Sequence, residues 1–312
     1  MELIYGIHNL REKHRSCVAT IGAFDGIHLG HRALLDQVTA YAKKMNLPST
    51  VIVFEPLPRE YFAPKQSPAR LTSFRERHMQ LLSCGVDRVL LIHFTQAVSQ
   101  MSALEFIQRV FVDGLGVRQI VVGDDLRFGH DRQGDFGLLR DVGALNGFGV
   151  SQSDTFLLEG ERVSSTRIRK LLEQSDFTTA ERLLGRPYTI CGKVVVGRQL
   201  GRTLGAPTAN LELHRLKTAL SGVYAVNVML ASGKVMQGVA NVGTRPTVDD
   251  SIKAILEVHV LDFSGDLYGS LLEVTFLEKI RDEQRFANLD ELKTQIHQDI
   301  AWVHNFFNVA VS

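Results

Sequence analysis

Two different rhythms of apolar residues divide the chain, and they limit its possible folds more than any other feature. In the first half, short apolar runs rich in β-branched residues alternate with segments whose apolar residues recur every three or four positions, which is typical of strands alternating with amphipathic helices. Nearly continuous apolar strands in this order favour a parallel sheet covered by helices on both faces. The predicted strands are 18–21, 50–54, 89–92 and 119–122, and the predicted helices are 34–45, 74–84 and 103–115.

The rhythm changes after Gly185-Arg-Pro187, a breaker that predicts a domain boundary. We therefore expect a first domain over residues 1–184, ending in two short helices, and a second over 185–312. In the second domain, strand-like segments follow one another with Gly, Ser or Asp between most of them, which predicts an antiparallel barrel or sandwich. Its predicted strands are 188–196, 223–230, 235–242, 254–261 and 271–277, followed by an amphipathic helix over 289–307.

Composition restricts the class of partner. Lys plus Arg number 35 and Asp plus Glu number 34, so the net charge is +1, without the basic excess that is usual for nucleic-acid binders. No apolar run approaches the roughly 18 residues that span a bilayer, and early polar residues exclude a signal peptide. Cys17, Cys84 and Cys191 lie far apart with no Cys-x-x-Cys pattern, which predicts reduced thiols. We expect a cytoplasmic protein with small-molecule substrates, and neither a nucleic-acid nor a membrane partner.

One candidate site follows the strand that ends at residue 21. The segment Gly22-Ala-Phe-Asp-Gly-Ile-His28-Leu-Gly-His31 opens a predicted helix, and a helix start attracts phosphate through its unpaired N–H groups. Gly26 lets the backbone approach an anion closely. His28 and His31 can donate hydrogen bonds to the charge that develops on phosphorus oxygens during nucleotidyl or phosphoryl transfer. The alternative is that these histidines are structural.

A second candidate site lies in the second half. The segment Gly192 to Asn210 is rich in glycine, but it lacks the Gly-Lys-Ser/Thr ending of a Walker A loop and the helix after it. The hydroxyl of Thr208 suits a hard cation. Farther along, strand alternation places Glu257 and His259 on one face, and a kinase needs a group near the attacking hydroxyl. The alternatives are a glycine-marked hairpin with a buried Thr and a solvated strand face.

The first motif resembles the His-x-Gly-His nucleotidyltransferases, which transfer a nucleoside monophosphate and release pyrophosphate on a Rossmann-like domain. The segment Ser164-Ser-Thr-Arg-Ile-Arg169 resembles their triphosphate-binding loop. The segment Gly123-Asp-Asp-Leu-Arg-Phe-Gly129, with residues 54–60, resembles the flavin-binding side of bacterial FAD synthetase. The resemblance implies that His28 and His31 are catalytic. It also implies an ATP site of Gly22, Phe24, Gly26, His28, His31, Ser164, Ser165, Thr166 and Arg169, and a flavin site of Asp124, Asp125, Arg127 and Phe128.

The second motif resembles the riboflavin kinase signature, whose Pro-Thr-Ala-Asn element binds magnesium and ATP phosphates. The resemblance implies that Thr208 and Asn210 are metal ligands and that Glu257 takes the proton from the ribityl 5′-hydroxyl. It also implies an ATP site of Gly192, Lys193, Gly201, Arg202, Gly205, Pro207, Thr208 and Asn210, and a flavin site of Asn241, Arg245 and Arg285.

Together the resemblances cover essentially the entire chain, which is identified as a member of the bifunctional riboflavin kinase/FMN adenylyltransferases. They imply that riboflavin and ATP give FMN at the C-terminal barrel, and that FMN and ATP give FAD at the N-terminal domain, both with Mg²⁺. The kinase half departs from the family at Ala206 and at Val196-Gly-Arg198. Two alternatives therefore stay open: only the adenylyltransferase is active, or the chain is a flavin- or nucleotide-binding regulator without turnover.

Overall fold

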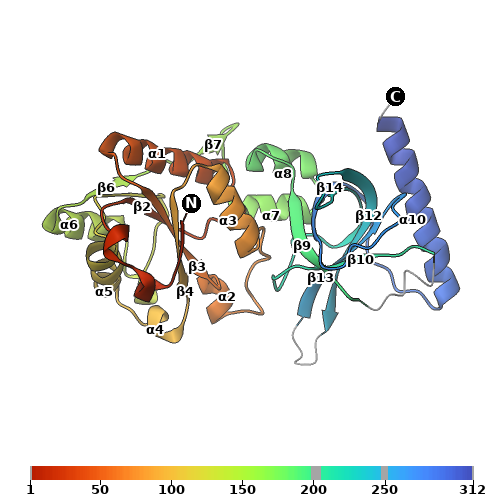
Figure 1. The fold of residues 1–312 in the computed structure, drawn as a ribbon, viewed down its shortest axis with the longest axis horizontal. Coiled ribbons are helices and arrows are strands. Elements are labelled where there is room, and N and C mark those ends of the chain that lie inside the picture. The colour runs from red at the N-terminus through yellow and green to blue at the C-terminus, as the bar shows by residue number, and fades with distance from the viewer. Residues whose placement is uncertain (1, 198–204, 247–251, 311–312) are drawn as a thin grey trace. The chain divides into compact units, whose positions relative to one another are not determined.

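The computed structural model describes residues 2–197, 205–246 and 252–310. These form two compact units (Figure 1): Met1–Pro68 with Phe74–Ser164, and Ala69–Ser73 with Ser165–Ser312. The short segment Ala69–Ser73 is grouped with the second unit because its backbone is bound there. Arg215 donates from Nη1 to the carbonyl of Leu71 (3.1 Å), and the Tyr188 hydroxyl donates to the same carbonyl (3.2 Å).

The first unit is built on a six-stranded parallel sheet, which confirms the predicted α/β class. Its strands are β1 (Glu2–Tyr5), β2 (Val18–Ile21), β3 (Ser49–Glu55), β4 (Arg88–His93), β5 (Gln119–Val122) and β6 (Gly149–Gln152), in the order β1-β4-β3-β2-β5-β6. Its longer helices are α1 (Leu29–Met45), α3 (Phe74–Ser83) and α6 (Phe136–Asn146), and its shorter ones are α2 (Pro58–Phe62), α4 (Gln96–Ser99), α5 (Ala103–Phe106) and the π-helical η3 (Ile107–Gly114). Three 3₁₀ turns, η1 (Ile7–Asn9), η2 (Glu12–His14) and η4 (His130–Arg132), and the hairpin β7 (Leu157–Leu158) and β8 (Glu161–Arg162) complete the unit.

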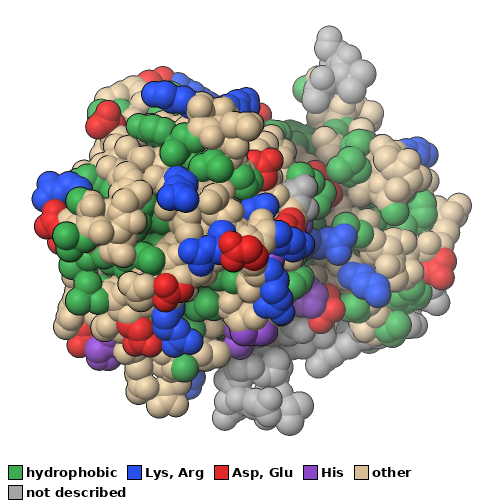
Figure 2. Space-filling model, turned by 60° about the vertical axis from the view of Figure 1, so that its left-hand side comes forward, with side chains coloured by type: hydrophobic (Ala, Val, Ile, Leu, Met, Phe, Trp, Pro, Cys, Tyr) green, Lys and Arg blue, Asp and Glu red, His purple; other side chains and the backbone are tan. Residues whose placement is uncertain are grey.

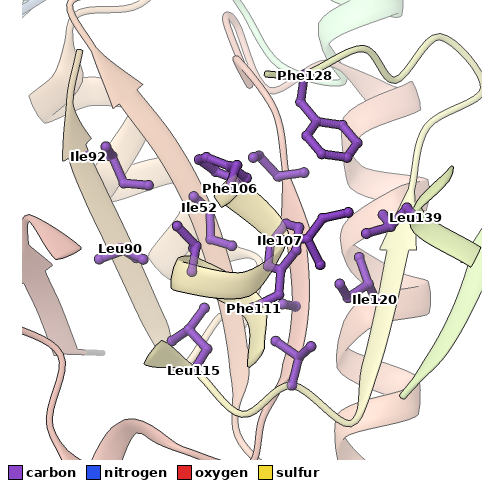
Figure 3. Close-up of a cluster of buried hydrophobic side chains, with 14 of the residues drawn as sticks. Ile52, Leu90, Ile92, Phe106, Ile107, Phe111, Leu115, Ile120, Phe128 and Leu139 are labelled. Atoms are coloured by element: carbon purple, nitrogen blue, oxygen red, sulfur yellow. The ribbon is translucent and has the colours of Figure 1, made fainter. Parts of the chain in front are cut away.

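Helices bury both faces of this sheet, because successive strand residues point to opposite sides. One core packs strand residues such as Ile52 and Ile120 against Phe106 and Phe111 of α5 and η3 (Figure 3). The other core packs alternate strand residues such as Val51 against α1 and α3. The sheet is therefore packed on both faces, and the loops at the carboxyl ends of its strands are where ligands bind in sheets of this kind.

The second unit is a closed antiparallel barrel, as predicted. Its strands are β9 (Thr189–Val195), β10 (Ala209–Glu212), β11 (Gly222–Met229), β12 (Val235–Pro246), β13 (Ile252–Val260) and β14 (Leu271–Arg281), closed in the order β10-β13-β12-β11-β14-β9. Strand β10 was not predicted, because it is four residues long and carries no apolar run.

Three helices accompany the barrel. They are α7 (Ser165–Glu173), α8 (Phe177–Leu184) and the long α10 (Leu289–Ala310), which matches the predicted C-terminal helix. The ring of Phe177 in α8 lies 6.3 Å from that of Phe276 in β14, and Val303 of α10 is buried beside Ala225 of β11. The domain boundary that the Gly185 breaker predicts stays a prediction. No helix in the described part of the chain is long and apolar enough to cross a membrane.

Candidate nucleotide sites

The first candidate site is a loop at the carboxyl end of β2. It has positive φ at Phe24 (49°), Gly26 (88°) and Ile27 (39°), so its backbone is tightly folded. His28 caps α1, accepting a hydrogen bond at Nδ1 from the backbone N–H of His31 (3.2 Å). The two imidazoles stack with their centroids 3.7 Å apart and their planes 13° apart. The structure thus brings the two predicted catalytic histidines together at the N-terminus of α1.

The electrostatic surroundings keep His31 neutral. Burial, the nearby His28 and the cationic Arg77 together hold the pKa of His31 well below its usual 6.5. Its Nδ1 atom is buried and has no hydrogen-bond partner among the residues that the structure describes. A neutral imidazole donates through one nitrogen only, so His31 offers a single N–H to a ligand.

Sequence reasoning missed one residue that shapes this site. Arg77 of α3 is almost fully buried, at 1% exposure. Its guanidinium donates to the carbonyls of Ala23 (2.7 Å) and Phe54 (3.3 Å) and forms an ion pair with Glu55 (2.8 Å). It therefore fastens the loop after β2 to the end of β3. The sequence carries no signal for this role, because α3 contains several polar and charged residues of similar appearance.

The predicted flavin loop follows β5. Asp124 pairs with Arg162 (2.8 Å) and accepts a hydrogen bond from the Thr155 hydroxyl. Phe128 is 7% exposed and belongs to the core drawn in Figure 3, so it anchors the loop to that core. Asp125 and Arg127 are exposed. A flavin-binding role for these four residues stays a prediction.

The predicted triphosphate loop straddles the two units. Ser164 is the last residue of the first unit, and Ser165 begins α7 of the second. The Arg169 guanidinium donates from Nε to the carbonyl of Ala69 (2.5 Å). An ATP-binding role for this loop stays a prediction.

The second candidate site is a row of polar residues across three barrel strands. Asn210 of β10 lies opposite Glu257 of β13, and Glu257 lies opposite Asn241 of β12. Their neighbours Leu256 and Val258 are fully buried inside the barrel, so this row faces outward. The register therefore brings the predicted base together with one predicted metal ligand and one predicted flavin ligand.

Thr208 precedes β10, and His259 fixes the segment that carries it. The imidazole of His259 donates from Nδ1 to the carbonyl of Pro207 (2.8 Å). Sequence reasoning placed His259 beside Glu257 but did not predict this anchor. The backbone at Gly197 lies against the side-chain amide of Asn210, so closely that a Cβ at Gly197 would overlap this amide. This contact fixes the position of the Asn210 side chain.

The glycines of the predicted kinase ATP segment have different surroundings. A Cβ at Gly192 would lie 2.7 Å from the Cβ of Leu211, so Gly192 allows β9 and β10 to approach. Gly205 has a φ of 81°. Lys193 lies opposite Glu212 in the register of strands β9 and β10. The predicted ligands Gly201 and Arg202 lie outside the described residues.

The remaining predicted flavin ligands lie on β12 and on the loop after β14. Arg245 is paired with Lys253 in the β12–β13 ladder. Arg285 lines an open cleft of about 800 Å³ between this loop and the first turns of α10. Their roles stay predictions.

The chain is similar to known proteins along its whole length. The FAD synthetase family matches residues 10–167, and the riboflavin kinase family matches residues 184–307. The bifunctional riboflavin kinase/FMN adenylyltransferase of Pseudomonas fluorescens is 52% identical over 301 residues, which covers 96% of each chain. The enzyme of the same name from Escherichia coli strain K12 is 48% identical over 310 residues, which covers 99% of each chain.

A solved structure agrees with the fold. A protein from Streptococcus pneumoniae, described as a macrolide-efflux protein, is 30% identical with a TM-score of 0.75. The match covers 98% of this chain and 99% of that one.

Proposed function

The chain belongs to the family of bifunctional riboflavin kinase/FMN adenylyltransferases, and from this premise we propose how its two candidate sites divide the work. The protein phosphorylates riboflavin to FMN with ATP and adenylylates FMN to FAD with release of pyrophosphate. We assign the first reaction to the barrel and the second to the parallel-sheet unit. The observation that carries this assignment is the polar row on the barrel's outer face, which sets a carboxylate between two amides.

In the kinase reaction, Glu257 is the general base. Its carboxylate takes the proton of the ribityl 5′-hydroxyl, the freed oxygen forms a bond to the γ-phosphorus of ATP, and the bond to the β-phosphate oxygen breaks, releasing ADP. Asn241 and Asn210 flank Glu257 on the neighbouring strands. They can orient the flavin on one side and the phosphates on the other.

The oxygen donors near this row fit a hard cation. The Thr208 hydroxyl and the Asn210 amide oxygen are the ligand types that Mg²⁺ accepts beside substrate phosphates and water. We therefore propose that these two residues hold the Mg²⁺ that accompanies ATP. When bound, the ion neutralises charge on the phosphate oxygens.

In the adenylyl transfer, a phosphate oxygen of FMN forms a bond to the α-phosphorus of ATP, and pyrophosphate leaves. The attacking oxygen is already ionised, so the protein has only to position the reactants and stabilise the developing charge. We assign that stabilisation to His28, His31 and the N-terminus of α1. We also propose that Ser164, Ser165, Thr166 and Arg169 bind the triphosphate and that Asp124, Asp125, Arg127 and Phe128 bind the flavin.

A single assay tests the assignment. Purified protein is given riboflavin, ATP and Mg²⁺, and riboflavin, FMN and FAD are separated by chromatography over time. We expect FMN to appear first and FAD to follow. If only added FMN were converted, the chain would be an adenylyltransferase alone. Flavin binding without either product would indicate a regulator.

We also propose that the protein works in the cytoplasm on small molecules. Cys17, Cys84 and Cys191 are free thiols, which is usual for a protein in a reducing compartment. Lys and Arg side chains gather near the middle of the face shown in Figure 2, with acidic side chains among and around them. The net charge of the chain is only +1, which supports small charged substrates over nucleic acid. Cell fractionation that recovered the protein with membranes or in the periplasm would contradict this placement.

A further inference from the structure

The carboxyl group of Glu283 lies directly over the backbone of β12. Glu283 belongs to the loop after β14, and its side chain covers Gly243 so closely that a Cβ at Gly243 would lie 2.9 Å from the Glu283 Cδ atom and would overlap its Oε1 atom. The three heavy atoms nearest to that position all belong to the Glu283 carboxyl group. The absence of a side chain at Gly243 is therefore what makes room for this carboxylate.

This carboxylate lies beside the kinase row. Gly243 is two residues beyond Asn241 on β12, and Asn241 is the register partner of Glu257. Residues two apart on a strand share a face and are separated by about 7 Å. The carboxylate of Glu283 therefore lies on the same outward face as Glu257, one such step along the strand.

The loop that carries Glu283 is held at several points. Arg281 forms an ion pair with the buried Asp299 of α10 (2.8 Å) and donates to the backbone carbonyl of Asp282 (3.0 Å). Lys279 pairs with the side chain of Asp282 (2.6 Å), and the Arg281 guanidinium lies over the ring of Phe286. These contacts hold the chain on both sides of Glu283.

Glu283 itself forms no ion pair and no side-chain hydrogen bond within the described parts of the chain. Its surroundings remove part of its hydration, and this burial raises the pKa of the carboxyl group. Glu283 is an exposed residue, so its unpaired carboxylate is accessible to a donor from a ligand. The ring and ribityl chain of riboflavin bring donors of this kind, and the row at Glu257 is where the end of that chain reacts.

We propose that Glu283 accepts a hydrogen bond from a ribityl hydroxyl of riboflavin, two or three carbons from the hydroxyl that is phosphorylated. The inference rests on the proposed kinase function of the polar row. One strand step, about 7 Å, is close to the full length of an extended ribityl chain, so a hydroxyl away from the reacting end can reach Glu283. Glu283 is then a binding and specificity residue that recognises the polyol, and Gly243 is required because it leaves the carboxylate in place.

The test compares Glu283→Ala, Gly243→Ala and the double variant with the wild-type enzyme. We expect each single substitution to raise the KM for riboflavin about tenfold, the range for losing one hydrogen bond to a charged group, with little change in kcat or in the KM for ATP. In Gly243→Ala the new methyl group pushes the carboxylate aside. The double variant should therefore be no worse than Glu283→Ala alone.

Two controls make the result specific. Glu278→Ala removes an exposed carboxylate from β14 and should leave the KM for riboflavin unchanged. Lumiflavin, which has the flavin ring but no ribityl chain, should inhibit the wild type and Glu283→Ala with equal Ki. The proposal is overturned by an unchanged KM in Glu283→Ala, by additive effects in the double variant, or by an equal loss of lumiflavin affinity.

The outcomes also separate this inference from the function on which it rests. If the wild-type protein made no FMN from riboflavin, the kinase assignment would fail. If the wild type were active and Glu283→Ala bound riboflavin normally, only the role of Glu283 would fail. Circular dichroism of each variant, and its conversion of FMN to FAD, report whether the chain is still folded.

Discussion

His28 serves both the fold and the proposed chemistry of the first site. Its Nδ1 atom caps α1, and its ring stacks on that of His31. Gly30 permits this arrangement, because a Cβ there would lie 3.2 Å from two atoms of the His28 ring. A substitution at position 28 therefore has to be designed so that the loss of the cap and the loss of the imidazole can be told apart.

We predict that His28→Ala and His28→Asn both slow FAD formation from FMN by about 10²-fold, the effect of removing one donor aimed at developing charge. Asn is a good N-cap residue and Ala is not, so only His28→Ala should lose about 1 kcal/mol of stability. Urea denaturation and the FMN-to-FAD rate give the two readouts. Full activity in His28→Asn would show that the cap, and not the imidazole, matters.

The low pKa of His31 makes stability depend on pH. In the unfolded chain His31 binds a proton near pH 6.5, whereas burial, His28 and Arg77 oppose that proton in the folded protein. Stability contributed by the neutral ring is therefore complete above that pH and is lost as the pH falls below it. The wild-type free energy of unfolding should decrease as the pH is lowered from 7.5 to 5.5. We predict that this decrease is smaller in His31→Gln. Identical pH dependence in wild type and variant would contradict this assignment.

At the scale of secondary-structure elements, the segment that follows β9 packs closely against β10. This close packing fixes the side chain of Asn210, the proposed Mg²⁺ ligand. Gly197 faces its amide with no room for a Cβ. We predict that Gly197→Ala displaces this amide and lowers riboflavin phosphorylation about tenfold, with FMN adenylylation unchanged. Asn210→Ala should lose at least as much, and the double variant should add nothing further. A fully active Gly197→Ala enzyme would show that the amide position is unimportant.

The elements marked by a continuous apolar run or a sustained helical period could be predicted from the sequence, and the others could not. Strands β2 and β5 match their predicted limits because apolar β-branched runs define them. Strands β1 and β6 were missed because neither is a continuous apolar run: β1 begins with Glu2, and β6 includes Gly149 and Ser151. Arg77 and His259 were missed as anchors for a different reason. Their roles depend on contacts with distant carbonyls, which no local pattern reveals.

At the scale of the whole molecule, the two reactions share a diffusible intermediate, FMN. Glu257→Gln should block FMN formation by about 10²-fold or more and leave adenylylation intact, and His28→Ala should do the reverse. We predict that mixing these two variants restores FAD synthesis from riboflavin, because FMN made by one protein is used by the other. A mixture that accumulated FMN and no FAD would contradict independent sites.

The pairing of Asn210, Glu257 and Asn241 across three strands ties catalysis to barrel closure. Side chains on a strand alternate between two faces, so a slip of one residue in β13 would turn Glu257 inward and expose its buried neighbours. Such a slip would remove the carboxylate from both amides at once. Misassembled barrels are therefore expected to have no riboflavin kinase activity. The specific kinase activity of a refolded preparation should be proportional to the fraction of molecules whose barrel has closed in the correct register.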